Sequence, residues 1–241
     1  MKYTFLMIAI LTVAYSGVAL AQSPSQLRPS EQVTDRSYYA NPKFDFMVRA
    51  AMNSMNDNFR FDRFRSLYTQ TRQYDPLGDD TIKEMQNLAY TIQNGETQDD
   101  KLEALEAYRN LVMMHMANIR VVAQALSFTK LDKAFGRADF FTWLRKGLIR
   151  DVMNPQDGKS LKTAYNVVTL TEETVLLGQL GVSILATSAA QESQIYYNMH
   201  EVEDLRTGQK STIFVNTTRP MRYLNAKYKQ SGGGSFSILR Q

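Results

Sequence analysis

The fold of this 241-residue chain is decided by two segments, GLIRDVMNPQDGKSLKTAYNVVTLTEETVLLGQLG (residues 147–181) and YYNMHEVEDLRTGQKSTIFVNTT (residues 196–218). The apolar period changes from about 3.6 residues to about 2 beyond Gly178 and Gly181. Residues 195–202 then alternate between two strand faces, residues 204–208 form a turn, and residues 212–216 return as a β-branched strand. We therefore predict an α+β fold that is mainly α, with an antiparallel helical array followed by a small C-terminal β-hairpin or sheet.

Upstream of residue 147, apolar residues recur at helical spacing in several short segments. The first begins at Pro42, and its apolar positions are Phe44, Met47, Val48, Ala51 and Met55. A second carries an aromatic stripe at Phe61, Phe64, Leu67 and Tyr68, with Arg60, Arg63 and Arg65 expected on its solvated side. The array is similar in outline to tetratricopeptide proteins, but a test at a 34-residue period shows no repeat.

Local signals place the helix ends and turns. Residues 74–80 (YDPLGDD) form a turn, and Thr81 with Glu84 predicts a capping box for the helix that runs to Gln93. Asn118 is a cap or break before residues 119–126, and residues 140–152 form another helix. After a loop at residues 155–158, Ser160 is predicted to cap a helix through Leu161, Ala164, Val167 and Val168. A short helix is expected at residues 221–228.

The first 21 residues have the pattern of a secretory signal peptide. Lys2 is their only charge, an apolar run follows at residues 5–15, and Ala19-Leu20-Ala21 supplies the small residues of a cleavage site after Ala21. We expect export to a periplasm or secretion, with no stable membrane anchor after cleavage. Residues 22–41 are predicted to be a flexible leader, residues 42–228 a single α+β domain and residues 229–241 a flexible tail.

Composition excludes several classes of chemistry. Lys and Arg number 28 against 24 Asp and Glu, for a formal charge of +4, and the basic residues are scattered, so no nucleic-acid partner is expected. With no cysteine the chain has no disulfide, thiolate metal site or cysteine nucleophile. Its two histidines, His115 and His200, lack zinc-site spacing, so we predict no metal and no cofactor. His115 lies on an apolar helix face, which favours a core residue.

Five residues are low-specificity candidates for a binding site: Asp157, Ser160, Glu173, His200 and Asn216. The DGKS stretch at 157–160 resembles a phosphate loop but has Met153 where that motif needs glycine. His200 with an acidic neighbour could act as a general base, although we favour an exposed position on the outer face of the hairpin. A structural role is the alternative, with Asp157, Gly158, Ser160, Glu173 and Asn216 fixing turns, caps and hairpin docking.

Glu172 and Glu173 are adjacent, so on a helix their side chains diverge by about 100°. They are therefore not a facing catalytic pair, and one of them could face a cleft and the other solvent. Pairing with Glu201 or Glu203 would give the two carboxylates that a glycosidase needs, but no pattern in the sequence supports that pairing.

Three segments resemble a bacterial family known only as a domain of unknown function. They are FDRFRSLYTQTRQYDPLG (residues 61–78), residues 147–181, and YYNMHEVEDLRTGQKSTIFVNTTRPM (residues 196–221). Met153-Asn154-Pro155 departs from the serine-rich run of that family. The resemblance implies one helical, weakly tetratricopeptide-like domain with a C-terminal β-hairpin. It carries no known activity and so supplies no catalytic residue.

Two functional hypotheses follow, and binding is favoured over catalysis. The first is an exported module that binds a protein or peptide, with an immunity-type inhibitor of an exported toxin as one specific form. The alternative is a hydrolase of cell-wall or carbohydrate substrates, with its site where the helices meet the hairpin. Under either hypothesis we expect a pocket at that seam.

Overall fold

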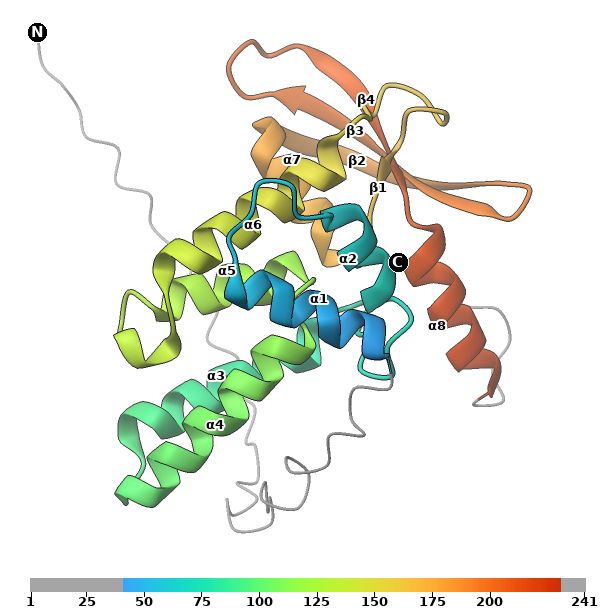
Figure 1. The fold of residues 1–241 in the computed structure, drawn as a ribbon. Coiled ribbons are helices and arrows are strands. Elements are labelled where there is room, and N and C mark those ends of the chain that lie inside the picture. The colour runs from blue at the N-terminus through green and yellow to red at the C-terminus, as the bar shows by residue number, and fades with distance from the viewer. Residues whose placement is uncertain (1–40, 231–241) are drawn as a thin grey trace, which may run out of the picture.

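The computed structural model describes residues 41–230, which form a group of packed helices and a C-terminal sheet (Figure 1). The helices are α1 (Pro42–Asn53), α2 (Phe61–Tyr68), α3 (Asp79–Asn94), α4 (Gln98–Met114), α5 (Ile119–Phe128), the 3₁₀ turn η4 (Lys133–Phe135), α6 (Ala138–Met153), α7 (Thr171–Leu180) and α8 (Thr218–Gln230). The strands are β1 (Tyr165–Asn166), β2 (Val182–Glu192), β3 (Ile195–Asp204) and β4 (Lys210–Asn216). The predicted α+β, mainly α class is therefore confirmed. The predicted signal peptide, the leader up to residue 40 and the tail from residue 231 lie outside the described residues.

Helix α1 begins and packs as its sequence predicts. The side chain of Asn41 accepts hydrogen bonds from the backbone N–H groups of Lys43 and Phe44, at 3.1 and 3.3 Å. Phe44 is fully buried and stacks on Phe64 of α2, with ring centroids 5.1 Å apart. Met55, predicted on the same apolar face, instead lies beyond the end of α1 and is exposed.

Arg65 corrects the prediction of a solvated basic side on α2. Arg60 and Arg63 are exposed, but Arg65 is only 4% exposed. Its guanidinium contacts three other elements: it forms ion pairs with Asp151 of α6 and Glu172 of α7, both at 2.7 Å, and donates to the Asn166 carbonyl of β1 at 2.9 Å. Burial alone would lower the Arg65 pKa, but the two carboxylates outweigh it and the pKa is raised. The Arg65 side chain of α2 therefore links the helices to strand β1 of the sheet.

Gly147 explains how α6 approaches α2 so closely. A Cβ atom on residue 147 would lie 2.0 Å from the Cζ atom of the Phe61 ring, far inside van der Waals contact. The missing side chain lets the buried Phe61 ring pack against the α6 backbone. The segment that organises the fold therefore begins at a helix–helix contact that requires glycine.

The predicted capping box at Thr81 and Glu84 is wrong. Helix α3 begins at Asp79, three residues before the start that a Thr81 cap implies, and Gly78, at φ +76°, is its N-cap. Thr81 instead donates its hydroxyl to Asp75, whose other carboxylate oxygen accepts the Gly78 N–H at 2.7 Å. The Asp75 carboxylate thus fixes the turn before α3 and ties the Thr81 hydroxyl to it.

Helices α3 and α4 form an antiparallel hairpin that projects at the lower left of Figure 1. A capping box does start α4, where the Thr97 hydroxyl accepts the Asp100 N–H and the Asp100 side chain accepts the Thr97 N–H. The Asn118 prediction is confirmed, since its side chain accepts the Arg120 N–H and caps α5.

The helix predicted from Ser160 through Val168 does not form. Residues 158–164 are turns, and Tyr165–Asn166 is the short strand β1, parallel to β4. The Val167 N–H donates to the Asn216 carbonyl at 3.3 Å, and the Phe214 N–H donates to the Gly158 carbonyl at 2.8 Å. Pairing with β4 therefore overrides the helical spacing of the apolar residues.

The sheet has the strand order β1-β4-β3-β2. The β3–β4 hairpin and its turn match the prediction, whereas β2 is an 11-residue strand that the sequence analysis did not identify. Pro220, predicted to end the return strand, lies in the first turn of α8, which continues to Gln230. Buried Val202 and Val215 belong to the same apolar cluster as Leu144 and Leu148 of α6, so the sheet and the helices share one core.

Replacing Arg65 with methionine should lower the free energy of unfolding by about 3–5 kcal/mol, because the buried Glu172 carboxylate would lose its counter-charge. Chemical denaturation followed by circular dichroism measures this change. The matched control is Arg63→Met, an exposed position on the same helix, which should change stability by less than about 0.5 kcal/mol. Equal effects of the two substitutions would contradict the role of Arg65.

Candidate functional site

Two of the five predicted site residues, Glu173 and His200, form a buried polar cluster between α7 and the sheet. The His200 Nε2 atom lies 2.8 Å from a Glu173 carboxylate oxygen. On the other side of the ring, Nδ1 lies 3.0 Å from the Thr187 hydroxyl of β2. Asn198 donates its side-chain amide to both Glu173 oxygens, at 3.0 and 2.9 Å. The cluster joins α7 to two neighbouring strands.

The surroundings of this cluster correct two predictions. His200 is 5% exposed, so it does not lie on an outer polar face of the hairpin. Glu172 and Glu173 are 1% and 7% exposed, so neither of them faces solvent. Their predicted divergence is confirmed, because Glu172 turns to Arg65 while Glu173 turns to His200. Sequence spacing revealed the divergence but not which residue would neutralise each carboxylate.

The other three candidates hold local backbone structure. Asp157 accepts the Lys159 N–H at 3.1 Å, and hydrogen bonds from Thr163 and Lys159 lower the Asp157 pKa. The Ser160 hydroxyl accepts the Thr163 N–H at 3.3 Å, which closes a turn. Asn216 accepts the Thr218 N–H at 3.0 Å, where α8 begins. These contacts match the structural alternative for all three residues.

The structure also explains why residue 158, between Asp157 and Ser160, is a glycine. Gly158 has φ +68°, and a Cβ atom there would lie 2.3 Å from the Tyr165 ring. Gly208 in the hairpin turn also has φ +68°. Both positions have the left-handed backbone conformation that favours glycine. The structural role expected for Gly158 therefore requires no bound phosphate.

Two cavities among the described residues lie away from all five candidates. A groove of about 1460 Å³ is lined by α1, by the loop before α3 and the first turns of that helix, and by α4 and α8. A second pocket of about 450 Å³ continues along α4 toward η4 and the start of α6. Met52, Glu106, Asn110 and Met113 line both, so the two form one continuous surface, named here the α4 groove. Neither of these two cavities lies at the seam between the helices and the hairpin, so the pocket expected there stays a prediction.

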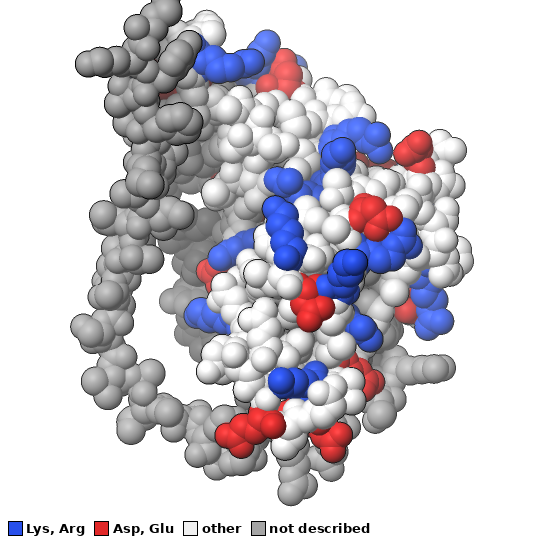
Figure 2. Space-filling model, turned by 90° about the vertical axis from the view of Figure 1, so that its left-hand side faces the viewer, with Lys and Arg blue, Asp and Glu red and all other residues white. Residues whose placement is uncertain are grey.

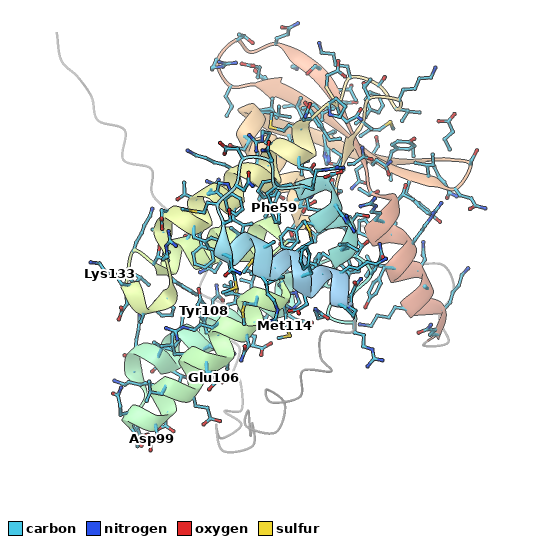
Figure 3. The ribbon with its side chains drawn as sticks, in the orientation of Figure 1. Phe59, Asp99, Glu106, Tyr108, Met114 and Lys133 are labelled. Carbon is cyan, nitrogen blue, oxygen red and sulfur yellow. The ribbon has the colours of Figure 1, made fainter. Side chains whose placement is uncertain are left out.

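The α4 groove is lined by methionine, aromatic and acidic side chains. Figure 3 shows Glu106, Tyr108 and Met114 along α4, with Asp99 at the far tip of the α3–α4 hairpin. The apolar lining includes Met52, Met113, Met114, Phe140 and Phe141. Unbranched methionines adapt to differently shaped partners, so they are frequent in surfaces that bind peptides.

Acidic groups outnumber basic ones in the larger part of the groove. It is lined by Asp45, Asp75, Asp79, Asp80, Glu84 and Glu106, against Arg49, Lys83 and Lys227. Asp45 is paired with Arg49, and Asp79 with Arg120. Asp80, Glu84 and Glu106 have no ion-pair partner within residues 41–230. The Glu84 side chain reaches solvent, yet enough protein surrounds it for burial to raise its pKa.

His115 lies at the base of the α4 groove and is a core residue, as predicted. Its Nδ1 atom lies 2.9 Å from the Tyr68 hydroxyl, which also accepts the Asp75 N–H at 3.3 Å. Burial lowers the His115 pKa to about 4, so the ring is neutral at pH 7. A neutral imidazole can accept a hydrogen bond from the Tyr68 hydroxyl, and this bond fixes both side chains beneath the groove.

Sequence reasoning missed the α4 groove because its lining comes from segments far apart in the chain. No residue of it forms a motif, and the methionine pair at 113–114 is the only local signal.

In the part of the chain that the structure describes, no helix has the length and apolarity needed to cross a membrane. The same residues contain no group of three or more His, Asp or Glu side chains that could hold a metal ion.

Comparison with known proteins gives no relative: no family model, curated protein or solved structure matches this chain. The resemblance to a family of unknown function therefore stays a prediction. Functional argument rests on the geometry of the polar cluster and of the α4 groove.

Acid should destabilise the protein through His115. The unfolded chain binds a proton near the ordinary pKa of 6.5, whereas the folded chain resists it down to about 4, so stability is complete above pH 6.5 and declines below it. We expect this residue to contribute about 2 kcal/mol to the loss between pH 7 and pH 5. Denaturant unfolding of the wild type and of His115→Gln at both pH values measures it, and identical pH dependence in the two proteins would contradict the assignment.

Proposed function

We propose that this protein is an exported protein-interaction module that holds a segment of its partner in the α4 groove. The observation that supports this function is the size of the groove. Small-molecule pockets usually enclose about 300–1,000 Å³, whereas the larger part of the groove alone encloses about 1460 Å³ and continues into a second pocket. A folded peptide segment fills such a space better than a metabolite does.

The lining supports a cationic amphipathic helix as the occupant. Asp80, Glu84 and Glu106 would face the basic residues of the partner. Burial raises the Glu84 pKa, and a nearby cation would offset that effect. Met52, Met113 and the Phe140–Phe141 pair would contact its apolar side. A helix with lysines on one face and leucines on the other presents both surfaces at once.

Figure 2 shows charges of both signs on one face of the molecule. On the face shown in Figure 2, Lys and Arg alternate with Asp and Glu and form no continuous basic region. A nucleic-acid partner would call for such a region, whereas the excess of acidic residues in the larger part of the α4 groove suits a cationic partner.

Export is part of this proposal and rests on the signal-peptide pattern of residues 1–21. Within that setting, an inhibitor of an exported toxin is one specific form of a protein-binding module. If the protein is such an inhibitor, the partner recovered from periplasmic extract should stop bacterial growth when it is produced in cells that lack this protein. A partner that leaves growth unaffected would exclude the toxin-inhibitor form and leave the binding function intact.

Glu106→Lys should weaken binding of a fluorescent 18-residue lysine–leucine helical peptide by about tenfold, because like charges then meet in the groove. Fluorescence anisotropy at low and high salt measures the affinity. Glu103→Lys is the matched control, since it makes the same change on the exposed surface of α4 outside the groove lining. Equal affinities for the two variants, or equally tight binding of a glutamate–leucine peptide by the wild type, would overturn the proposed function.

A hydrolase is the alternative, and one observation favours it. Thr187, His200 and Glu173 form a hydroxyl–imidazole–carboxylate chain, which is the arrangement of nucleophile, base and orienting acid in many hydrolases. Against it, His200 is buried, and the cluster does not line either part of the α4 groove. The cluster is better suited to fixing α7 on the sheet.

The wild-type protein should therefore release no soluble fragments from purified peptidoglycan or from chitin oligosaccharides. Chromatography of the reaction products tests this expectation. Hydrolysis that disappears in both His200→Gln and Glu173→Gln, while their thermal unfolding stays cooperative, would replace the binding proposal with the enzyme.

A further inference from the structure

The two edges of the sheet differ in how they are covered. At one edge β4 pairs with β1, and the Phe214 N–H donates to the Gly158 carbonyl of the preceding loop. At the other edge β2 pairs with β3 alone, as Figure 1 shows. Within residues 41–230, no backbone group of β2 bonds to a segment other than β3. Among the described residues, the backbone donors and acceptors on the outer edge of β2 therefore have no partner.

Strand β2 also lacks most features that keep a sheet edge from pairing with another chain. Its sequence is VSILATSAAQE, with one charge, at Glu192, and no proline. It is 11 residues long, longer than most strands, and Ile184 and Leu185 are 50% and 48% exposed. Exposed edge strands are normally protected by lysine, proline or short length. A bulge near Leu185 is the one protective feature present.

We propose that β2 is a homodimer interface, in which the β2 strands of two copies pair antiparallel about a two-fold axis near Thr187. The two four-stranded sheets then become one continuous sheet of eight strands. An antiparallel pair related by a two-fold axis uses the same strand from each copy, so one open edge satisfies the other. This inference is independent of the α4 groove, which involves none of the residues of β2.

The side chains of β2 favour a second copy as the occupant. Pairing centred on Thr187 places the large, exposed Ile184–Leu185 pair of one copy opposite the small Ala189–Ala190 pair of the other. No like charges meet, because the only charged residue, Glu192, falls opposite the uncharged start of the partner strand near Val182. Large side chains therefore face small ones at both ends of a neutral interface.

Leu185→Lys tests the interface by placing a charge on the open edge. We expect a dimer mass for the wild type and a monomer mass for this variant in sedimentation and light scattering across a concentration series. Leu205→Lys is the matched control, because it makes the same change at the exposed β3–β4 turn, and it should remain a dimer. Circular dichroism checks that each variant is folded.

A cross-linking experiment tests the register without depending on that substitution. The chain has no cysteine, so a single Thr187→Cys would lie beside its two-fold copy and form an intermolecular disulfide on mild oxidation. Ser211→Cys on the exposed part of β4 should not. The proposal is overturned if the wild-type protein is monomeric at every concentration, even if it binds an unrelated extended peptide at β2. A dimeric Leu185→Lys variant overturns it as well, and so does equal cross-linking of the two cysteine variants.

Discussion

The structure depends on the buried charge of Arg65. A guanidinium removed from water is tolerated only where carboxylates and carbonyls surround it, and here those groups come from α6, α7 and β1. Glu172 also accepts the Val168 N–H, so the same carboxylate fixes the backbone just before α7. Because each partner lies on a different element, the helices and the sheet can satisfy this charge only in one relative position.

The Glu173–His200 pair extends that constraint into the sheet. Adjacent carboxylates on α7 point to opposite partners, one toward Arg65 of the helical array and the other toward β3. Helix α7 therefore connects the two halves of the molecule through two neighbouring side chains. The polar residues of the deciding segment hold the fold together, and the space for a partner lies elsewhere, along α4.

Local patterns predicted the parts of the fold that local chemistry determines. The apolar faces of α1 and α2, the Asn118 cap and the β3–β4 turn followed from spacing and cap residues. The patterns failed where a distant segment decides the outcome: Val167 pairs with β4 instead of continuing a helix. The burial of Arg65 and His200 depends on carboxylates 107 and 27 residues away in the sequence, a separation over which no periodicity carries information.

The central claim is that the seam between the helices and the sheet is structural, while the α4 groove binds the partner. Methyl NMR during titration with the lysine–leucine helical peptide tests this most directly, because methionine methyls mark the groove and the methyls of buried Val202, on the same face of β3 as His200, mark the seam. We expect the signals of Met52 and Met113, in the groove, to shift with added peptide while the signals of Val202 stay in place. A saturable shift of Val202 with unchanged Met52 and Met113 would contradict this claim.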